Sequence, residues 1–228
     1  SGAEIIFTPE MSGLLDRDSR RLAAAARAES DDPVLAAVCA TAAAKGVAVA
    51  LGSLAIRDGD GPLAHRSFLI APDGTILARY DKMHLFDVDL PDGTRIRESA
   101  TFRPGYTPAT ADLPWGRLGL SICYDVRFPA LYQWLARAGA AVIAVPAAFT
   151  VPTGETGCFL VAAAQAGRHE DGRETFGHSL VVSPWGEILL DLGEEPGTAL
   201  LDLDLAAVAQ ARARIPALAH AKPMPAVA

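Results

Sequence analysis

One cysteine of this sequence stands where a nucleophile would be expected. Cys123 lies in Leu118-Gly-Leu-Ser-Ile-Cys123-Tyr-Asp-Val-Arg-Phe-Pro129, where an apolar, strand-like run is followed at once by the start of a helix. Such a turn exposes the thiol, directs the following backbone N–H groups at a developing oxyanion, and lets the helix N-terminus favour the thiolate. The alternative is a buried structural cysteine, the commoner fate of a free cysteine. Cys39 and Cys158 lack this turn and are expected to be packing residues.

A cysteine nucleophile needs a base, and the sequence offers two kinds. In cysteine proteases the base is histidine. Spacing does not choose among the candidate histidines, which are His65, His84, His169 and His178. The other kind is a pair of charged residues, Glu10 in Phe7-Thr-Pro-Glu10-Met and Lys82 in Tyr80-Asp-Lys82-Met-His. Each follows a strand-like run, where chain ends gather at one edge of a sheet, although each taken singly reads as a solvated charge.

The elements that must position these residues are predicted to be mixed α and β. Short apolar runs predict strands at residues 4–7, 47–56, 66–71, 75–80, 118–122, 141–145, 159–164, 179–182, 187–192 and 199–203. Capping and stop residues predict helices at residues 33–45, 129–138 and 205–214, with Asp32 and Asp204 as caps. The turn residues of 71–75 and 183–187 predict two hairpins, and hence some antiparallel pairing.

Composition narrows the class of protein. The chain has 228 residues, half of them hydrophobic, which suffices for one sizeable core, and we expect a single domain over residues 1–228. A net charge of −7 argues against nucleic acid as a partner. Three cysteines without paired metal-type spacing support neither a disulfide framework nor a metal site, and fit a reducing, cytoplasmic setting. The apolar runs are far below the ~20 residues that span a bilayer, so no membrane association is expected.

Taken together, the blocks around Glu10, Lys82 and Cys123 resemble the three signature blocks of the nitrilase, or carbon–nitrogen hydrolase, superfamily. They are Phe-Thr-Pro-Glu10-Met, Tyr-Asp-Lys82-Met-His-Leu-Phe-Asp and Ile-Cys123-Tyr-Asp-Val-Arg-Phe-Pro, in this order. The resemblance extends from about residue 5 to about residue 215. It implies an α/β fold, an αββα four-layer sandwich with mixed sheets, and association of two such sandwiches into a homodimer or a larger homo-oligomer.

The resemblance also implies roles for the site residues. Cys123 attacks the amide carbonyl, Glu10 acts as general base and later activates water, and Lys82 stabilises the tetrahedral intermediate. The physical logic agrees, because an adjacent ammonium lowers the cost of both a thiolate and an oxyanion. The backbone N–H of Tyr124 is the expected second oxyanion donor. Glu98 matches an additional glutamate of the family, which positions Lys82 or helps with proton handling; the alternative is an ordinary loop carboxylate. No metal or cofactor is implied.

Residues 164–179 resemble the branch of the superfamily called Nit, whose eukaryotic members are amidases acting on deaminated glutathione. A small amide substrate that carries carboxylates would need polar and cationic anchors. The candidates are Arg127, Arg168, Arg173 and His178. The alternatives are internal ion pairing for Arg127 and solvated loop charges for Arg168 and Arg173.

Other functions stay open. One is an ω-amidase or an N-carbamoyl amino-acid hydrolase, and true nitrile hydrolysis is disfavoured. Another is a catalytically silent, nitrilase-like binding or scaffold protein, against which the retention of two acids and a lysine argues. A third is a histidine-assisted cysteine hydrolase, which requires His84 or His178 to contact the Cys123 sulfur.

The sequence departs from the family pattern at three points. A strand and helix normally precede the Glu10 block, and a further helix normally follows residues 151–158; neither is found in this sequence. We expect residues to be missing there, with a break of the chain near residues 154–156; a genuine deletion would remove one wall of the site. The third departure is His65, where the family pattern leads us to expect asparagine.

Overall fold

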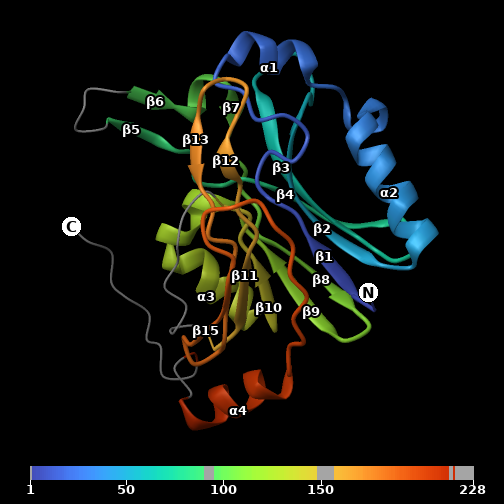
Figure 1. Cartoon of the computed structure of the whole chain (residues 1–228), viewed down its shortest axis with the longest axis vertical. Coiled ribbons are helices and arrows are strands. Elements are labelled where there is room, and N and C mark those ends of the chain that lie inside the picture. The colour runs from blue at the N-terminus through green and yellow to red at the C-terminus, as the bar shows by residue number, and fades with distance from the viewer. Residues whose placement is uncertain (1, 90–94, 148–156, 216–217, 219–228) are drawn as a thin grey trace.

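Two mixed β-sheets packed face to face form the centre of the molecule (Figure 1). The structure is a computed structural model, and it describes residues 2–89, 95–147, 157–215 and 218. The expected break near residues 154–156 lies outside these described residues.

The first sheet is formed by the N-terminal part of the chain, in the order β1-β2-β3-β4, with β7 beside β3. Strand β1 runs parallel to β2, whereas β2, β3 and β4 form an antiparallel meander. These strands are β1 (Ile5–Phe7), β2 (Ala48–Ile56), β3 (Leu63–Ile70), β4 (Ile76–Asp81) and β7 (Phe102–Arg103).

The second sheet has the order β15-β14-β11-β10-β9-β8. Strands β9, β10 and β11 are parallel, and antiparallel strands flank them on both sides. The strands are β8 (Ala109–Leu113), β9 (Gly116–Leu120), β10 (Val142–Ala144), β11 (Phe159–Ala162), β14 (Leu180–Val182) and β15 (Ile188–Asp191). Both sheets are therefore mixed.

Helices cover the outer faces of the two sheets, as Figure 1 shows for α2 and α3 on opposite sides. Helix α2 (Pro33–Lys45) packs on the first sheet through Leu35 and Ala42. Helix α3 (Pro129–Arg137) lies against the second sheet, where a Cβ at Gly119 would meet Leu135. Between the sheets lies the main core. The order helix, sheet, sheet, helix confirms the predicted αββα sandwich.

Capping chemistry explains where the helices begin and end. The Asp32 carboxylate accepts a hydrogen bond from the backbone N–H of Leu35 at 2.9 Å, and Gly46 ends α2 in the left-handed conformation, with φ 62°. Helix α4 (Ala206–Arg214) begins beside the predicted cap Asp204, which accepts from Ala206. None of the helices in the described residues is long and apolar enough to cross a membrane.

Both predicted hairpins are present and share one geometry. Residues 71–75 join β3 to β4, and residues 183–187 join β14 to β15. In each turn the first residue and the fifth are hydrogen bonded at 2.8 Å, and a glycine at the fourth position has φ near 86°. Glycine fits there because residues with a Cβ rarely adopt that conformation.

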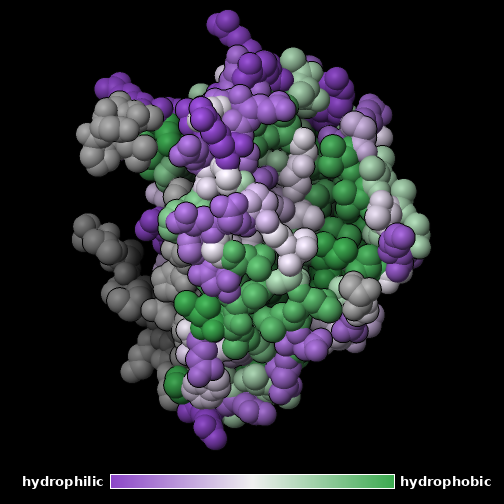
Figure 2. Space-filling model, viewed as in Figure 1, coloured by the Kyte–Doolittle hydropathy of each residue, from purple (hydrophilic) through white to green (hydrophobic). Residues whose placement is uncertain are grey.

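Some elements differ from the prediction. Residues 199–203 form no strand, because their apolar side chains find no neighbouring strand; Leu200 remains 61% exposed. Helix α1 (Ser19–Ala25), capped by Asp18, was not predicted. Nor were β8 and two small hairpins, whose strands are β5 (Asp87–Asp89) with β6 (Arg95–Arg97), and β12 (Ala166–Arg168) with β13 (Glu174–Phe176). Figure 2 shows hydrophilic side chains gathered over this end of the molecule, around α1.

Two glycines let other segments pass close to the first sheet. A Cβ at Gly52 would collide with the carbonyl oxygens of Thr8 and Pro9. A Cβ at Gly105 would collide with the backbone of Asp81. Because no side chain fits there, only glycine allows the segments before Glu10 and Lys82 to approach this closely.

Truncating a core leucine should cost far more stability than truncating an exposed one in the neighbouring strand. Leu69 is fully buried between the sheets, whereas Leu77 on β4 is 40% exposed. We expect Leu69→Ala to lower the free energy of unfolding by about 2–5 kcal/mol, since it leaves a cavity. Leu77→Ala should cost less than about 1 kcal/mol. Urea unfolding checks both, and equal losses would contradict the assigned core.

Candidate active site

The ammonium of Lys82 lies buried between two carboxylates. Its Nζ is 3.1 Å from Oε1 of Glu10 and 2.9 Å from Oε2 of Glu98, and the Lys82 side chain is only 2% exposed. Glu10 lies in the segment after β1, Lys82 directly follows β4, and Glu98 opens the 3-10 helix η2 (Glu98–Ala100). The fold thus brings together Glu10, Lys82 and Glu98, which the sequence resemblance had grouped.

The electrostatics of this group favour ionised side chains. Burial opposes the charge of Lys82, but Glu10, Glu98 and Cys123 outweigh it and raise the pKa of the ammonium above its usual range. Burial likewise works against the Glu98 carboxylate, yet the hydrogen bond from His65 and the charge of Lys82 lower its pKa to about 2. The effect of Cys123 on Lys82 means that the thiol lies within electrostatic reach of the ammonium.

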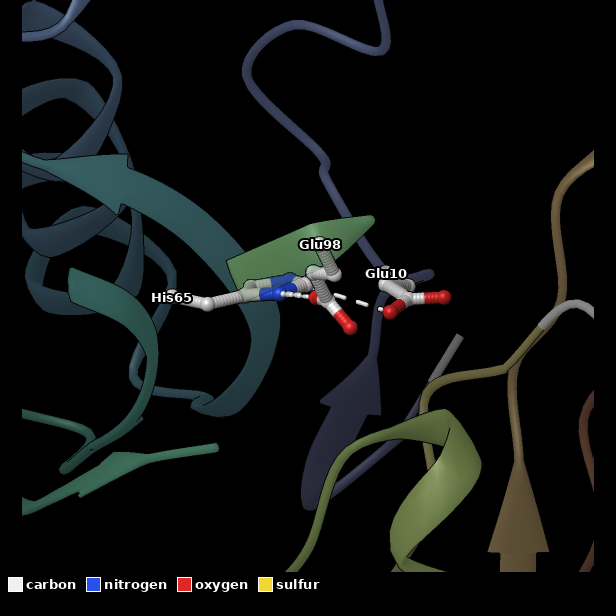
Figure 3. A group of neighbouring side chains, drawn as sticks. All are labelled: Glu10, His65 and Glu98. Carbon is white, nitrogen blue, oxygen red and sulfur yellow. Dashed lines mark hydrogen bonds and ion pairs between the residues drawn. The ribbon is translucent and has the colours of Figure 1, made fainter. Parts of the chain in front are cut away.

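His65 contacts both acids, and its ring points toward Glu98 and Glu10 (Figure 3). Its Nδ1 lies 2.7 Å from Oε1 of Glu98, and its Nε2 lies 2.8 Å from Oγ of Ser53 and 3.7 Å from Oε1 of Glu10. The imidazole stacks on Phe102 with ring centroids 4.9 Å apart. The histidine that stands in place of the expected asparagine is therefore part of the site.

Glu10, His65 and Glu98 have ligand atoms within 4.8 Å of one another, a spacing that would suit a metal ion. Lys82, however, places its ammonium between the same two carboxylates. A divalent cation bound there would lie against this positive charge. The donor set therefore fits an ammonium better than a metal.

Cys123 opens the short 3-10 helix η3 (Cys123–Arg127), directly after β9 and residues 121–122. Its φ of 45° lies in the left-handed region that residues other than glycine rarely adopt, and such strain gathers at functional sites. Its backbone N–H donates to the carbonyl of Pro146 at 2.8 Å, just beyond the end of β10. Tyr124 follows in the first turn of η3, where N–H groups lack helical partners. The predicted strand-to-helix turn at Cys123 is present, but it does not expose the residue as expected, because Cys123 is buried in the core between the sheets.

Asp125 ties the Cys123 turn to the segment after Lys82. Fully buried, its carboxylate accepts from the Tyr80 hydroxyl at 2.7 Å and from the Ile122 backbone N–H at 2.9 Å. It also accepts from the backbone N–H of His84 at 3.1 Å and from Nδ1 of the same residue at 2.7 Å. Four donors therefore converge on one side chain.

The second half of the chain holds the Glu10 segment. The Gln165 amide donates to the carbonyl oxygen of Glu10 at 2.9 Å. In the hairpin that follows Gln165, Asp171 accepts from the backbone N–H of Arg17 at 2.8 Å and forms an ion pair with Arg173 at 3.3 Å. Arg173 thus has a structural contact in addition to its predicted substrate role.

The other predicted anchors lie on the surface or bind elsewhere. Arg127, in η3, and Arg168, in β12, are both exposed. His178 forms an ion-pair contact with Asp191 at 2.9 Å and stacks on Phe176. None of the contacts described for these three residues therefore links them to Glu10, Lys82, Glu98 or Cys123.

The histidine-assisted alternative gains no support from the histidine contacts. His84 is bonded to Asp125 and stacks on Phe128 with centroids 3.6 Å apart, and His169 is bonded to Thr175. His178 is bonded to Asp191, as above. Each of these rings already has a hydrogen-bond partner other than the Cys123 thiol.

Sequence reasoning did not identify Ser53, Asp125 or Gln165 as parts of this site. Their side chains act on backbone groups or on other side chains, so no spacing rule marks them. Asp125 had one usable signal, because it lies two residues after the candidate nucleophile. His65 also had a signal, the departure from the expected asparagine.

The comparisons with known sequences agree on one family. The sequence model described as carbon-nitrogen hydrolase matches residues 1–213. A deaminated glutathione amidase of Synechocystis sp. is 46% identical over 175 residues, covering 70% of this chain and 64% of that protein. The enzyme of the same name from Yersinia enterocolitica is 36% identical over 236 residues, covering 96% and 82%. The chain thus spans less than two thirds of the Synechocystis relative.

Solved structures agree as well. The Caenorhabditis elegans NitFhit protein has 32% identity and a TM-score of 0.84, with 96% of this chain and 57% of that chain covered. A mutant of the amidase from Nesterenkonia sp. AN1 has 29% identity and a TM-score of 0.76, covering 94% and 85%. That structure shows the result of Michael addition of acrylamide at the active-site cysteine.

The ionised Glu98 should make the fold sensitive to acid. Its pKa falls from an ordinary 4.5 to about 2 in the folded protein, so its stabilisation is complete above about pH 4.5 and is lost as the pH falls toward 2. We expect a loss of about 3 kcal/mol over that window. Urea unfolding between about pH 6 and pH 2.5 should show a smaller acid loss for Glu98→Gln. The exposed Glu187→Gln serves as control; parallel curves for all three proteins would contradict the assignment.

Asp125→Asn should loosen the nucleophile turn. An amide nitrogen would face two of the four donors, which leaves buried N–H or O–H groups without an acceptor. We expect a loss of about 2–4 kcal/mol in unfolding free energy. Asp112→Asn, which changes an exposed carboxylate paired with Arg117, should cost less than about 1 kcal/mol. Denaturant titration compares the two variants, and equal effects would be inconsistent with the buried network.

Proposed function

Since this chain belongs to the carbon–nitrogen hydrolase family, we propose that it is an amidase that hydrolyses a small carboxylate-bearing amide through a thioester on Cys123. The observation that carries the proposal is the buried Lys82 ammonium, held by Glu10 and Glu98 within electrostatic reach of Cys123. The amidase of Nesterenkonia sp. AN1, which shares the fold, takes an adduct at its active-site cysteine, and this supports the same nucleophile here.

The proposed reaction begins with proton transfer from the Cys123 thiol to Glu10. The thiolate sulfur attacks the amide carbonyl carbon, and the carbonyl oxygen becomes an oxyanion. The Lys82 ammonium and the backbone N–H of Tyr124 stabilise that charge. Glu10 then returns its proton to the leaving nitrogen, so that ammonia or an amine departs and a thioester remains. Glu10 next accepts a proton from water, whose oxygen attacks the thioester carbonyl. The C–S bond then breaks, the carboxylic acid departs, and the proton held by Glu10 returns to the sulfur, which regenerates the Cys123 thiol.

Glu98 suits a holding role better than proton transfer. With a pKa near 2 it stays ionised at neutral pH and carries no proton to give. Both of its oxygens lie about 3 Å from Nζ of Lys82, and one also accepts from the backbone N–H of Phe86 at 2.6 Å. Of the two roles that the resemblance left open, positioning Lys82 is therefore the one supported.

Deaminated glutathione is the first substrate to test. The curated relatives from Synechocystis and Yersinia carry that activity in their names. The exposed guanidinium groups of Arg127 and Arg168 are available to bind substrate carboxylates. The guanidinium of Arg173, in contrast, already forms an ion pair with Asp171. An α-keto-acid amide or an N-carbamoyl amino acid remains the alternative substrate.

The alternative without catalysis, a silent scaffold, has less support. A scaffold gains nothing from burying an ammonium and two carboxylates beside a strained cysteine, because each buried charge costs several kcal/mol to desolvate. The homodimer or larger oligomer and the cytoplasmic location stay predictions.

The test is turnover by the full chain, comparing wild type with Cys123→Ala. The panel holds deaminated glutathione, an α-keto-acid amide, an N-carbamoyl amino acid and a simple nitrile, with release of ammonia or amine as the readout. We expect one amide to be turned over, an acyl adduct at Cys123 by mass spectrometry, and a loss of at least about a thousandfold in the variant.

Cys39→Ala is the matched control, because Cys39 lies on α2, away from the site, and should leave turnover unchanged. A folded wild-type protein that shows neither turnover nor adduct on any panel member would favour the scaffold. Equal loss in Cys39→Ala and Cys123→Ala would argue against Cys123 as the nucleophile.

A further inference from the structure

His65 is the one imidazole in the described residues that contacts both Glu98 and the Glu10 side of the site. It lies on β3, is 2% exposed, and is not needed in the reaction as proposed above. A buried histidine that only filled space would not require two hydrogen bonds of 2.7 and 2.8 Å to polar side chains of the site. Its role therefore needs a separate explanation.

The hydrogen bonds define which nitrogen carries the proton. Glu98 is ionised and can only accept, so Nδ1 of His65 donates to it. On the other side, Oγ of Ser53 already accepts from the backbone N–H of Met11 at 2.8 Å. The Ser53 hydroxyl is fully buried, and Nε2 of His65 is the acceptor within its reach at 2.8 Å. The neutral tautomer with the proton on Nδ1 satisfies every one of these groups.

We propose that neutral His65 is a positioning residue for the reaction, fixing Glu98 against Lys82 and, through Ser53, the segment of Glu10, and that protonation of its Nε2 switches the site off. The proposal rests on the proposed function for the catalytic roles of Glu10, Lys82 and Cys123.

The effect of protonation follows from the groups that face the ring. The charged groups are Glu98 from η2, Glu10 from the segment after β1, and Lys82 behind both, while Ser53 and Phe102 add no charge. A proton on Nε2 removes the acceptor of the Ser53 hydroxyl. The new N–H then faces Oε1 of Glu10 at 3.7 Å, the oxygen that accepts from Lys82.

A second cation at that oxygen stabilises Glu10 as an anion. It thereby lowers the tendency of Glu10 to take the thiol proton, which is the first step of the reaction. The switch works in one direction: the site is active with neutral His65 and loses activity when the imidazole is protonated.

Two isosteric substitutions separate the functions of the two ring nitrogens. In His65→Asn the amide nitrogen takes the place of Nδ1, so the bond to Glu98 is kept and the basic Nε2 is removed. In His65→Gln the amide reaches the place of Nε2, so the contact to Ser53 is kept and the bond to Glu98 is lost. The full chain is used for wild type and both variants, with folding monitored by near-ultraviolet circular dichroism and melting temperature.

The readout is the rate of Cys123 alkylation by iodoacetamide from about pH 4.5 to pH 8, followed by the mass of the Cys123 peptide, together with kcat/KM for the amide that is turned over. For wild type we expect both rates to fall on the acid side of this range. His65→Asn should stay within about threefold of wild type near pH 7.5, and its acid fall should move at least about one pH unit lower. His65→Gln should be about tenfold slower or worse near pH 7.5, because the charge-assisted bond to Glu98 is lost.

Three results would overturn the inference. They are a wild-type profile that is flat from about pH 4.5 to pH 8, an acid fall in His65→Asn that coincides with that of wild type, and a His65→Gln protein as reactive as His65→Asn. Because alkylation needs no amide substrate, it reads the role of His65 even if no amide is turned over. Absence of turnover with the expected alkylation profiles would count against the proposed function alone.

Discussion

The buried ammonium of Lys82 is the constraint on which the rest of the site depends. An ammonium taken out of water costs several kcal/mol unless opposite charges surround it. Here Glu10 and Glu98 supply those charges from two other segments, at 3.1 and 2.9 Å. The three segments are far apart in the sequence, so the ion group forms only when β1, β4 and η2 have been brought to one end of the first sheet.

The surrounding packing makes that close approach possible. Gly52 and Gly105 leave space for the backbone next to Glu10 and Lys82, where any Cβ would collide with a carbonyl group. Asp125 then joins the first sheet to the second, because it accepts from Tyr80 on β4 and from Ile122 at the nucleophile turn. Gln165 holds the backbone of Glu10 from the second half of the chain. The αββα arrangement is therefore also what places the thiol and the ion group on the same side of the core.

A buried group of this kind has little tolerance for an extra proton. Lys82 and Glu98 have pKa values displaced in the directions that keep both ionised, which leaves Glu10 as the carboxylate that remains for proton transfer. His65 adds a titratable ring at a position where the sequence resemblance had led us to expect the neutral amide of asparagine. Its hydrogen bonds to Glu98 and Ser53 are satisfied in one tautomer, so the protonation state of one ring and the geometry of two acids are linked.

The sequence by itself predicted most helix and strand positions and the strand-to-helix turn of Cys123, and its resemblance to the family predicted the layers and the grouping of Glu10, Lys82 and Glu98. These features depend on the periodicity, capping residues and turn residues of short stretches, or on the short sequence blocks that carry the resemblance. It predicted a strand at 199–203 that does not form, because a strand needs a neighbour that no local pattern reveals. Only the tertiary structure brought His65 into contact with two acids, gave Asp125 its bonds to Tyr80 and His84, and joined Asp171 to the backbone of Arg17. Contacts between distant segments depend on how the sheets pack, and that packing is not written in any one stretch of the chain.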